Sequence, residues 1–411
     1  MPANIRKMLI AAIMIGAAPP AFADVITDWN EKGVAYVTGK MAPAAAQRIL
    51  AITHVAMFDA VNSIERRYHP YLVQLPAGAT TSKEAAAGAA AGTVLAALNP
   101  QAEAEFKGAM AAYLAGIPDG ESTTQGIALG EAVAAKILAA RANDGSEAPD
   151  SYRPKTRPGV YVPTPSMVSS TWPNLKPFAL KSQSQFRPQP PIPLKGAEWA
   201  KDYNEIKALG ARNSTSRSAR QTEDARFWLI TGPQSTDPIA RQIVIAKKLS
   251  LIDSARFMAV VTVAAADAGV AVFDAKYHYD FWRPVTAIRN GDIDDNPATE
   301  RDATWQPIAD TPMHPEYPCA HCLISNSVAS AIEALLGTAE IPEVIMTSPT
   351  ALGATHRFTN IRAYADEVAH ARIWAGFHYR FSTRVGQDAG RKVGQYVVDN
   401  VMRPMSVVGT Q

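Results

Sequence analysis

Apolar residues recur at helical spacing along most of the chain, and alternating strand patterns are nearly absent. The clearest helical stretches in the first half are rich in Ala, Leu, Ile and Glu and contain no internal proline. They cover residues 44–68, 82–98 and 121–142. A helical pattern resumes from about residue 198. The pattern therefore predicts an all-α fold built of paired helix bundles.

The segment 144–197 interrupts this pattern with many Pro, Ser, Arg and aromatic residues. Its aromatic side chains give it apolar surface to bury, so we expect it to wrap over the helices as a long surface excursion. These side chains are Tyr161, Trp172, Phe178 and Phe186. We predict two helical halves, residues 24–197 with this excursion and residues 198–411 with the candidate site described below.

The first residues have the organisation of a secretory signal peptide. Arg6 and Lys7 precede an apolar stretch over residues 8–18, which is too short to span a bilayer. The tripeptide Ala-Phe-Ala that ends at Ala23 has the small-x-small pattern of a cleavage site. We therefore predict a signal peptide over residues 1–23 and a mature protein that is periplasmic or secreted.

Composition narrows the function classes. The chain of 411 residues is 47% hydrophobic and 19% charged, which is enough apolar material for a large core. A formal net charge of +2 excludes a general basic surface for nucleic acid, and two cysteines cannot form a disulfide framework. The apolar stretch 257–275 contains Asp267 and Asp274, which are costly at membrane depth, so we expect a buried helix and no membrane-spanning segment. Nothing in the sequence predicts the oligomeric state.

Six of the eight histidines fall within residues 278–378, a region where three segments carry candidate chemistry. In the first segment, KYHYDFWRP, Lys276 and Arg283 are seven residues apart, so we expect them on one helix face. That face continues backwards as an apolar stripe, and buried cations need an anion. Taken alone, the segment favours the simpler interpretation of two cations at the solvated end of a helix.

The second segment places Cys319, Ala320 and His321 at the start of a predicted helix whose apolar positions span residues 323–336 and which Gly337 ends. Free backbone N–H groups and the positive end of the helix dipole favour an anion at such a helix start. A histidine at that position can donate a hydrogen bond to a bound oxyanion or accept one from it.

The third segment, residues 361–382, predicts a helix whose apolar stripe includes Arg372 and which Gly376 ends. His378 follows in a turn and can direct a ring nitrogen into the same space. Three glycines then recur at every fourth position and predict the close approach of another helix: Gly386, Gly390 and Gly394.

Together, the three segments predict one site for a tetrahedral or trigonal-bipyramidal oxyanion. Their order and spacing resemble the signature shared by vanadium-dependent haloperoxidases and type-2 phosphatidic acid phosphatases. The resemblance covers about residues 270–395, and the stretch WRPVTAIRNGD is similar to secreted bacterial haloperoxidases. The matching positions are Lys276, Arg283-Pro284, Pro318-Cys319-Ala320-His321, Ala371-Arg372, His378 and Ser382. The resemblance implies the paired helix bundles of that superfamily.

The resemblance also implies a role for each position. His378 would be the covalent ligand to vanadium in a peroxidase, or the phosphorylated nucleophile in a phosphatase. His321 would be the general acid–base. The backbone N–H of Ala320 would bond an oxyanion oxygen, and Cys319 would stand where the motif has serine. Three cations would neutralise the oxyanion: Lys276, Arg283 and Arg372.

The implied reaction is the oxidation of a halide by hydrogen peroxide, with a small organic acceptor. Vanadate would be the cofactor, acting as a Lewis acid, and phosphate can occupy the same site. His314 stands five residues before the motif serine, where the resembling bromoperoxidases also have histidine and chloroperoxidases tend to have an aromatic residue. This position favours bromide over chloride.

Four positions depart from the signature. Cys319 replaces a serine, and a thiol is a weak hydrogen-bond donor. Ser382 replaces the aspartate that would orient His378, which weakens the phosphohistidine route more than oxyanion binding. Ala320 replaces a glycine, and Ala371 replaces a serine.

These departures leave other functions open. One is a soluble secreted acid phosphatase that acts through a phosphohistidine, and another is an inactive oxyanion-binding module. Cys319 and Cys322 form Cys-x-x-Cys at a helix start, so a disulfide, a thiol redox protein and a zinc site with a histidine are further alternatives. The absence of a βαβ pattern speaks against the redox protein.

Overall fold

The computed structural model describes residues 24–163 and 166–405, and helices dominate it. The helices are α1 (Val25–Val37), α2 (Pro43–Glu65), α3 (Lys83–Leu98), α4 (Glu103–Leu114), α5 (Glu121–Arg141), α6 (Ala197–Leu209), α7 (Ala219–Phe227), α8 (Asp237–Lys247), α9 (Leu251–Tyr279), α10 (Pro284–Arg289), α11 (Ala320–Leu336), α12 (Ile361–Trp374) and α13 (Arg380–Asn400). The predicted all-α class is confirmed. The predicted signal peptide lies outside the described residues.

The described ranges contain one small antiparallel hairpin, which the helical pattern did not predict. It pairs β1 (Glu340–Thr347) with β2 (Thr355–Asn360), and Val344 lies opposite Phe358. Both of these side chains are buried, so the hairpin adds one apolar face to the core and leaves the helical class unchanged.

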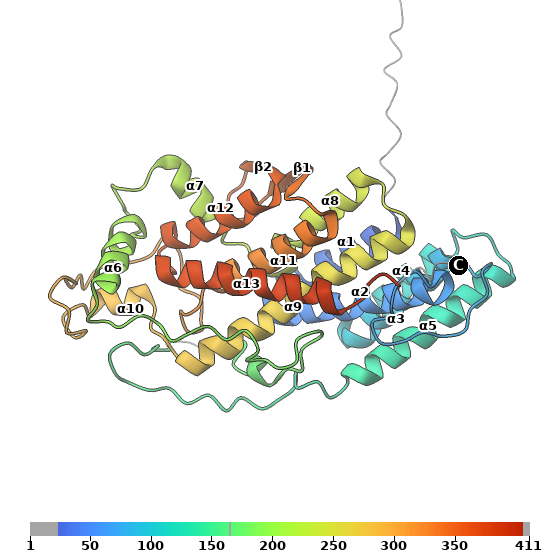
Figure 1. Ribbon diagram of the computed structural model, residues 1–411, viewed down its shortest axis with the longest axis horizontal. Helices are drawn as coiled ribbons and strands as arrows, with labels where there is room; N and C mark the ends of the chain where they lie inside the picture. Colours follow the sequence, from blue (N-terminus) through green and yellow to red (C-terminus); the bar gives the residue numbers. More distant parts are fainter. Residues whose placement is uncertain (1–23, 164–165, 406–411) are drawn as a thin grey trace, which may run out of the picture.

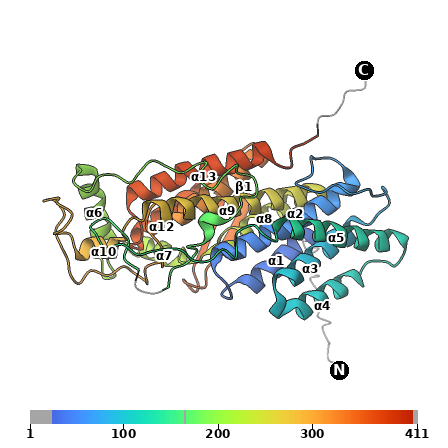
Figure 2. The same ribbon diagram turned by 90° about the horizontal axis from the view of Figure 1, so that it is seen from below.

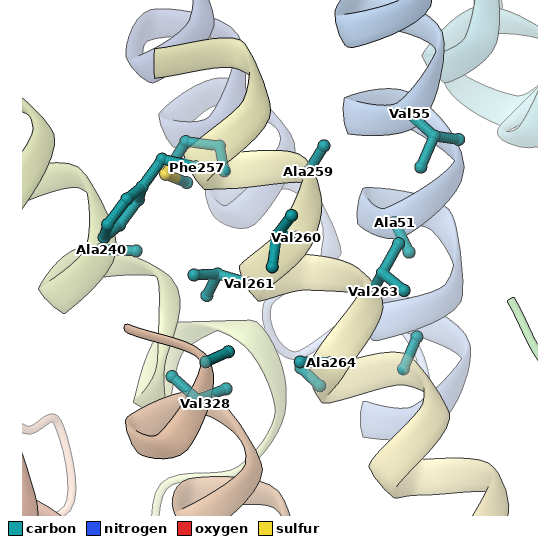
Figure 3. Close-up of a cluster of buried hydrophobic side chains, with 14 of the residues drawn as sticks. Ala51, Val55, Ala240, Phe257, Ala259, Val260, Val261, Val263, Ala264 and Val328 are labelled. Carbon is teal, nitrogen blue, oxygen red and sulfur yellow. The ribbon is translucent and has the colours of Figure 1, made fainter. Parts of the chain in front are cut away.

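Helix α9 forms the centre of the fold (Figure 1, Figure 2). It is long and apolar enough to cross a membrane, but its most apolar window is entirely buried within the protein. Figure 3 shows Val263 of α9 close to Ala51 of α2, while Val261 points towards Val328 of α11. The predicted buried helix is confirmed, and one apolar core joins the N-terminal helices to the C-terminal ones.

The excursion before α6 provides the hydrogen-bond partners of the two buried aspartates of α9. The Asp267 carboxylate accepts three backbone N–H groups from residues 178–180, at 2.6, 2.7 and 2.9 Å. Arg187 forms a bidentate pair with Asp274, with both N···O distances at 2.7 Å. Because buried carboxylates need such partners, the excursion is tied to the core helix along its length. The predicted boundary between residues 197 and 198 stays a prediction.

The glycines of α13 form a ridge on which α11 lies. A Cβ atom at Gly386 would stand 2.7 Å from the Cys319 carbonyl oxygen. At Gly390 and Gly394 it would stand 2.3 and 2.1 Å from the carbonyl oxygens of Leu323 and Ser327. The predicted close approach is therefore confirmed, and it fixes the first turn of α11.

We expect Gly390→Ala to lower the free energy of unfolding by about 1–3 kcal/mol. The new methyl group would clash with the Leu323 carbonyl oxygen, which can move only if α11 moves. Gly108→Ala is the matched control, since Gly108 lies exposed on α4 with open space around it. That substitution should stabilise the protein by roughly 0.5–1 kcal/mol. Urea unfolding curves measure both changes. An equal effect at the two positions would contradict the close packing of α11 on α13.

Candidate active site

Lys276 and Arg283 do not share a helix face, so that prediction is wrong. Helix α9 ends at Tyr279, and Asp280 takes a left-handed conformation with φ of 53° that turns the chain away. Arg283 therefore stands at the N-cap of α10. The cations still lie near each other, because Arg283 is close enough to contribute to lowering the pKa of Lys276.

The segment 314–316 brings the two cations together. The Lys276 ammonium donates hydrogen bonds to the carbonyl oxygens of Pro315 and Glu316, at 2.9 and 2.7 Å. Arg283 Nε donates to the carbonyl oxygen of His314 at 2.9 Å. The loop before α11 thus anchors both side chains by its backbone.

Three cations are buried here without a salt-bridge partner in the described ranges. Lys276, Arg283 and Arg372 are at most 1% exposed, and within the described ranges none of them forms a salt bridge. Burial lowers the pKa of Lys276 well below its usual value, that of Arg283 to about 10 and that of Arg372 to about 9. Arg372 donates to the Trp228 carbonyl oxygen, while its buried Nε has no partner. The carboxyl of Glu316 is close enough to raise the pKa of Lys276 and of Arg283, but it can offset only one of the three positive charges. The cluster is therefore short of negative charge, which a bound oxyanion would supply.

His378 faces this cluster with a lone pair. Its Nε2 lies 3.2 Å from Nη1 of Arg283, which can only donate, so Nε2 is the acceptor. The proton is then on Nδ1, which donates to Oε1 of Glu316 at 2.8 Å. Burial, followed by the charges of Arg283, Lys276 and Arg372, lowers the pKa of His378 well below its usual value. His378 is therefore a neutral imidazole whose Nε2 lone pair faces the cations and accepts from Arg283.

Glu316 is a functional candidate that sequence reasoning missed. Its carboxyl is fully buried, and Oε1 also accepts the Tyr379 N–H at 3.1 Å. It takes the orienting role that the signature gives to an aspartate at the position of Ser382. The Ser382 hydroxyl is close enough to lower the pKa of Glu316, although the two groups lack hydrogen-bond geometry. A lone acid between two prolines, in HPEYP, was the only signal in the sequence.

Two further histidines flank the cluster. His314 Nδ1 lies 3.0 Å from Nη2 of Arg283 and 3.1 Å from the Pro315 carbonyl oxygen. His321 Nε2 donates to the Ile230 carbonyl oxygen at 3.0 Å, which leaves the lone pair on Nδ1. Burial lowers the pKa of both rings well below the usual value, and Lys276 and Arg372 respectively contribute next. Both imidazoles are therefore neutral.

The start of α11 supplies backbone donors. Helix α11 begins at Ala320, and the N–H groups of Ala320 and His321 bond to no protein acceptor in the described ranges. Cys319 caps the helix and forms a disulfide with Cys322. Cys319 thus has no S–H to donate and cannot make the side-chain contact expected of it.

A pocket of about 90 Å³ reaches this helix start, and its lining includes His314, Ala320 and His321. The buried cations are not part of that lining. The other walls are largely aromatic and aliphatic, with Trp228, Phe273, Ile324, Tyr364 and Val368 among them. The pocket therefore offers a small, mostly apolar chamber beside the two histidines.

The part of the chain that carries this site is similar in sequence to known proteins. A family model described as the VCPO second helical-bundle domain matches residues 256–406, which include the three buried cations, Glu316 and the three histidines of the site. Vanadium chloroperoxidase from Curvularia inaequalis is 29% identical over 186 residues, which are 37% of this chain and 30% of that relative. The match therefore spans less than a third of the relative's length.

Two solved structures share the fold. A bacterial vanadium-dependent iodoperoxidase superposes with a TM-score of 0.79 at 23% identity, covering 93% of this chain and 96% of the other. A holo-type bacterial vanadium-dependent chloroperoxidase superposes with a TM-score of 0.72 at 16% identity, covering 91% and 96%. The similarity thus extends over both helical halves.

Proposed function

Because the chain belongs to the vanadium haloperoxidase family, we propose that it is a vanadate-dependent haloperoxidase that oxidises a halide with hydrogen peroxide. One observation carries this proposal: three buried cations, which form no salt bridge in the described ranges and have a single carboxyl nearby, surround a neutral histidine whose Nε2 carries a lone pair. Charges buried in this way are costly unless an anion joins them. The residues present therefore fit an oxyanion with two or three negative charges.

Each residue has a proposed part in holding that oxyanion. The three cations neutralise its charge, the Ala320 N–H bonds one oxygen, and His378 Nε2 is the covalent ligand. When bound, vanadate supplies a Lewis-acid centre that binds and polarises peroxide without a change in oxidation state. Phosphate has a similar charge and shape and can occupy the same position.

His321 is the proposed general acid–base. The Ile230 carbonyl holds its Nε2–H, and Nδ1 keeps a lone pair at the edge of the pocket. Burial and the nearby Arg372 keep the ring neutral, so it can accept a proton from peroxide. The apolar pocket walls suit a small organic acceptor.

We propose bromide as the preferred halide on the strength of His314. A neutral imidazole held by Arg283 lines the pocket there, where an aromatic residue is typical of chloroperoxidases. The comparison structures are named for iodide and chloride, so the order of halides needs its own measurement.

An acid phosphatase is the second candidate, and the Glu316–His378 pair favours it. A carboxylate bonded to Nδ1 makes Nε2 a better nucleophile, which a phosphohistidine route requires. The redox alternative is weakened because Cys319 and Cys322 are fully buried and their sulfurs are joined. Joined sulfurs also cannot act as thiolate ligands for zinc. A disulfide suits the periplasmic or secreted location that we propose.

Parallel assays on the purified protein, residues 24–411, test the proposal. The protein is incubated with vanadate, peroxide and chloride, bromide or iodide, and a phenol dye reports halogenation. A second assay follows hydrolysis of a nitrophenyl phosphate. We expect vanadate-dependent halogenation that phosphate inhibits, with bromide preferred to chloride. Brisk hydrolysis without halogenation would reverse the ranking, and vanadate binding without either activity would indicate an inactive binding module.

A further inference from the structure

A second cluster of titratable side chains lies outside the proposed oxyanion site. Glu223 and Asp224 on α7 and His356 on β2 each direct one ligand atom into the same space, with all three atoms within 4.8 Å of one another. His356 and Asp224 are buried, at 2% and 4% exposure, whereas Glu223 is exposed. The cluster therefore opens to solvent on one side only.

His356 presents an unpartnered nitrogen to these carboxylates. Its Nε2 is buried without a hydrogen-bond partner, and the Glu223 and Asp224 oxygens lie 3.6 and 3.7 Å away. These distances are too long for hydrogen bonds. They are close to the separation of about 3.3–3.6 Å between two ligands that each stand about 2.0–2.2 Å from one tetrahedral zinc ion.

The other side of the imidazole is fixed as in a metal-bound histidine. His356 Nδ1 lies 2.5 Å from Oε1 of Glu367 on α12, and the same oxygen accepts the Trp228 indole N–H at 2.9 Å. The ring also stacks on Phe227, with ring centroids 3.7 Å apart. A carboxylate on Nδ1 holds the lone pair on Nε2, which is the usual outer-shell arrangement around zinc-binding histidines.

We propose that Glu223, Asp224 and His356 form a binding site for a divalent cation of the zinc class. A histidine nitrogen and two carboxylate oxygens provide three ligands, and the exposed side leaves room for water as the fourth. The ion would join α7 to β2, while Glu367 orients the histidine from α12. This site is independent of the proposed haloperoxidase activity.

Arg220 competes for the same space. Its Nε lies 2.8 Å from Oδ1 of Asp224, and Nη1 lies 3.1 Å from Oε1 of Glu223. The Arg220 side chain is 58% exposed, so it can swing into solvent when a cation with a higher charge density arrives. The site therefore predicts that removing Arg220 strengthens metal binding.

Titration calorimetry with zinc ion tests the proposal on untagged, chelator-treated protein without vanadate. We expect His356→Gln and Asp224→Asn each to weaken zinc binding at this site at least about ten-fold. His370→Gln, an exposed histidine on α12, should bind as the parent protein does. Arg220→Gln should bind zinc several-fold more tightly.

Thermal unfolding gives a second measurement. Zinc should raise the melting temperature of the parent protein and of Arg220→Gln, but not that of Asp224→Asn. If His356→Gln does not fold, the comparison of the parent protein with Asp224→Asn still tests the proposal. Zinc binding that is equal in the parent, Asp224→Asn and Arg220→Gln would overturn the proposal, because any zinc bound would then lie elsewhere.

Discussion

Replacing His378 with alanine is expected to reduce vanadate-dependent halogenation by on the order of 10³-fold or more. His378 Nε2 is the acceptor that Arg283 meets in the buried cluster, and its lone pair is the proposed bond to the oxyanion. The three cations remain in the variant, so phosphate should still bind, although more weakly. Steady-state halogenation rates and phosphate titration measure the two effects separately.

The His378→Ala experiment needs two control variants, because alanine also leaves the buried Glu316 without its hydrogen-bond partner. His378→Asn keeps an N–H donor near that carboxylate but supplies no imidazole, so it should fold and remain inactive. His370→Ala removes an exposed histidine from α12 and should leave the rate unchanged. Ordinary turnover in folded His378→Asn would show that Nε2 is not the ligand.

The sequence predicted the helices best where an apolar stripe is long. The predicted stretches at 44–68, 82–98 and 121–142 correspond to α2, α3 and α5 within a few residues. Helix α4 was missed because Phe106 is its only buried residue. A helix that buries a single side chain has no apolar stripe in its sequence. The hairpin was missed because its short strands gain their burial from the neighbouring helices.

At the site, too, patterns within one segment were predicted better than contacts between segments. Spacing within one segment predicted the start of α11, the end of α12 at Gly376 and the turn that carries His378. It failed at Lys276 and Arg283, because periodicity alone does not reveal that Asp280 ends the helix.

Contacts between distant segments were beyond such reasoning. The Glu316–His378 pair joins residues 62 positions apart, and His356 finds its carboxylates on α7. The cluster of histidines in the sequence accordingly divides in space. His314, His321 and His378 lie at the candidate active site, and His278 and His370 are exposed. His356 lies in the separate cluster with Glu223 and Asp224.

Glu316→Gln is expected to weaken vanadate affinity about 10–100-fold, the usual effect of removing an outer-shell partner. The amide can donate to Nδ1 of His378, which would place the proton on Nε2 and remove the lone pair. Burial raises the pKa of Glu316 to about 7. The carboxylate form that holds the correct tautomer is therefore present above about pH 7 and is lost as the pH falls through that value.

Vanadate affinity of the parent protein should thus decline on the acid side of pH 7, while Glu316→Gln should be weak throughout and lack this decline. The matched rescue is Glu316→Gln combined with Ser382→Asp, because Ser382 is buried close to Glu316 and the signature has aspartate there. Affinity measured by activity recovery across pH 6–8.5, a range of about one unit or more either side of that pKa, separates the cases. A purely structural role for Glu316 would lower stability without changing the pH profile. Recovery of both affinity and the acid-side decline in the double variant would require a carboxylate acting on Nδ1, since a structural role restores neither.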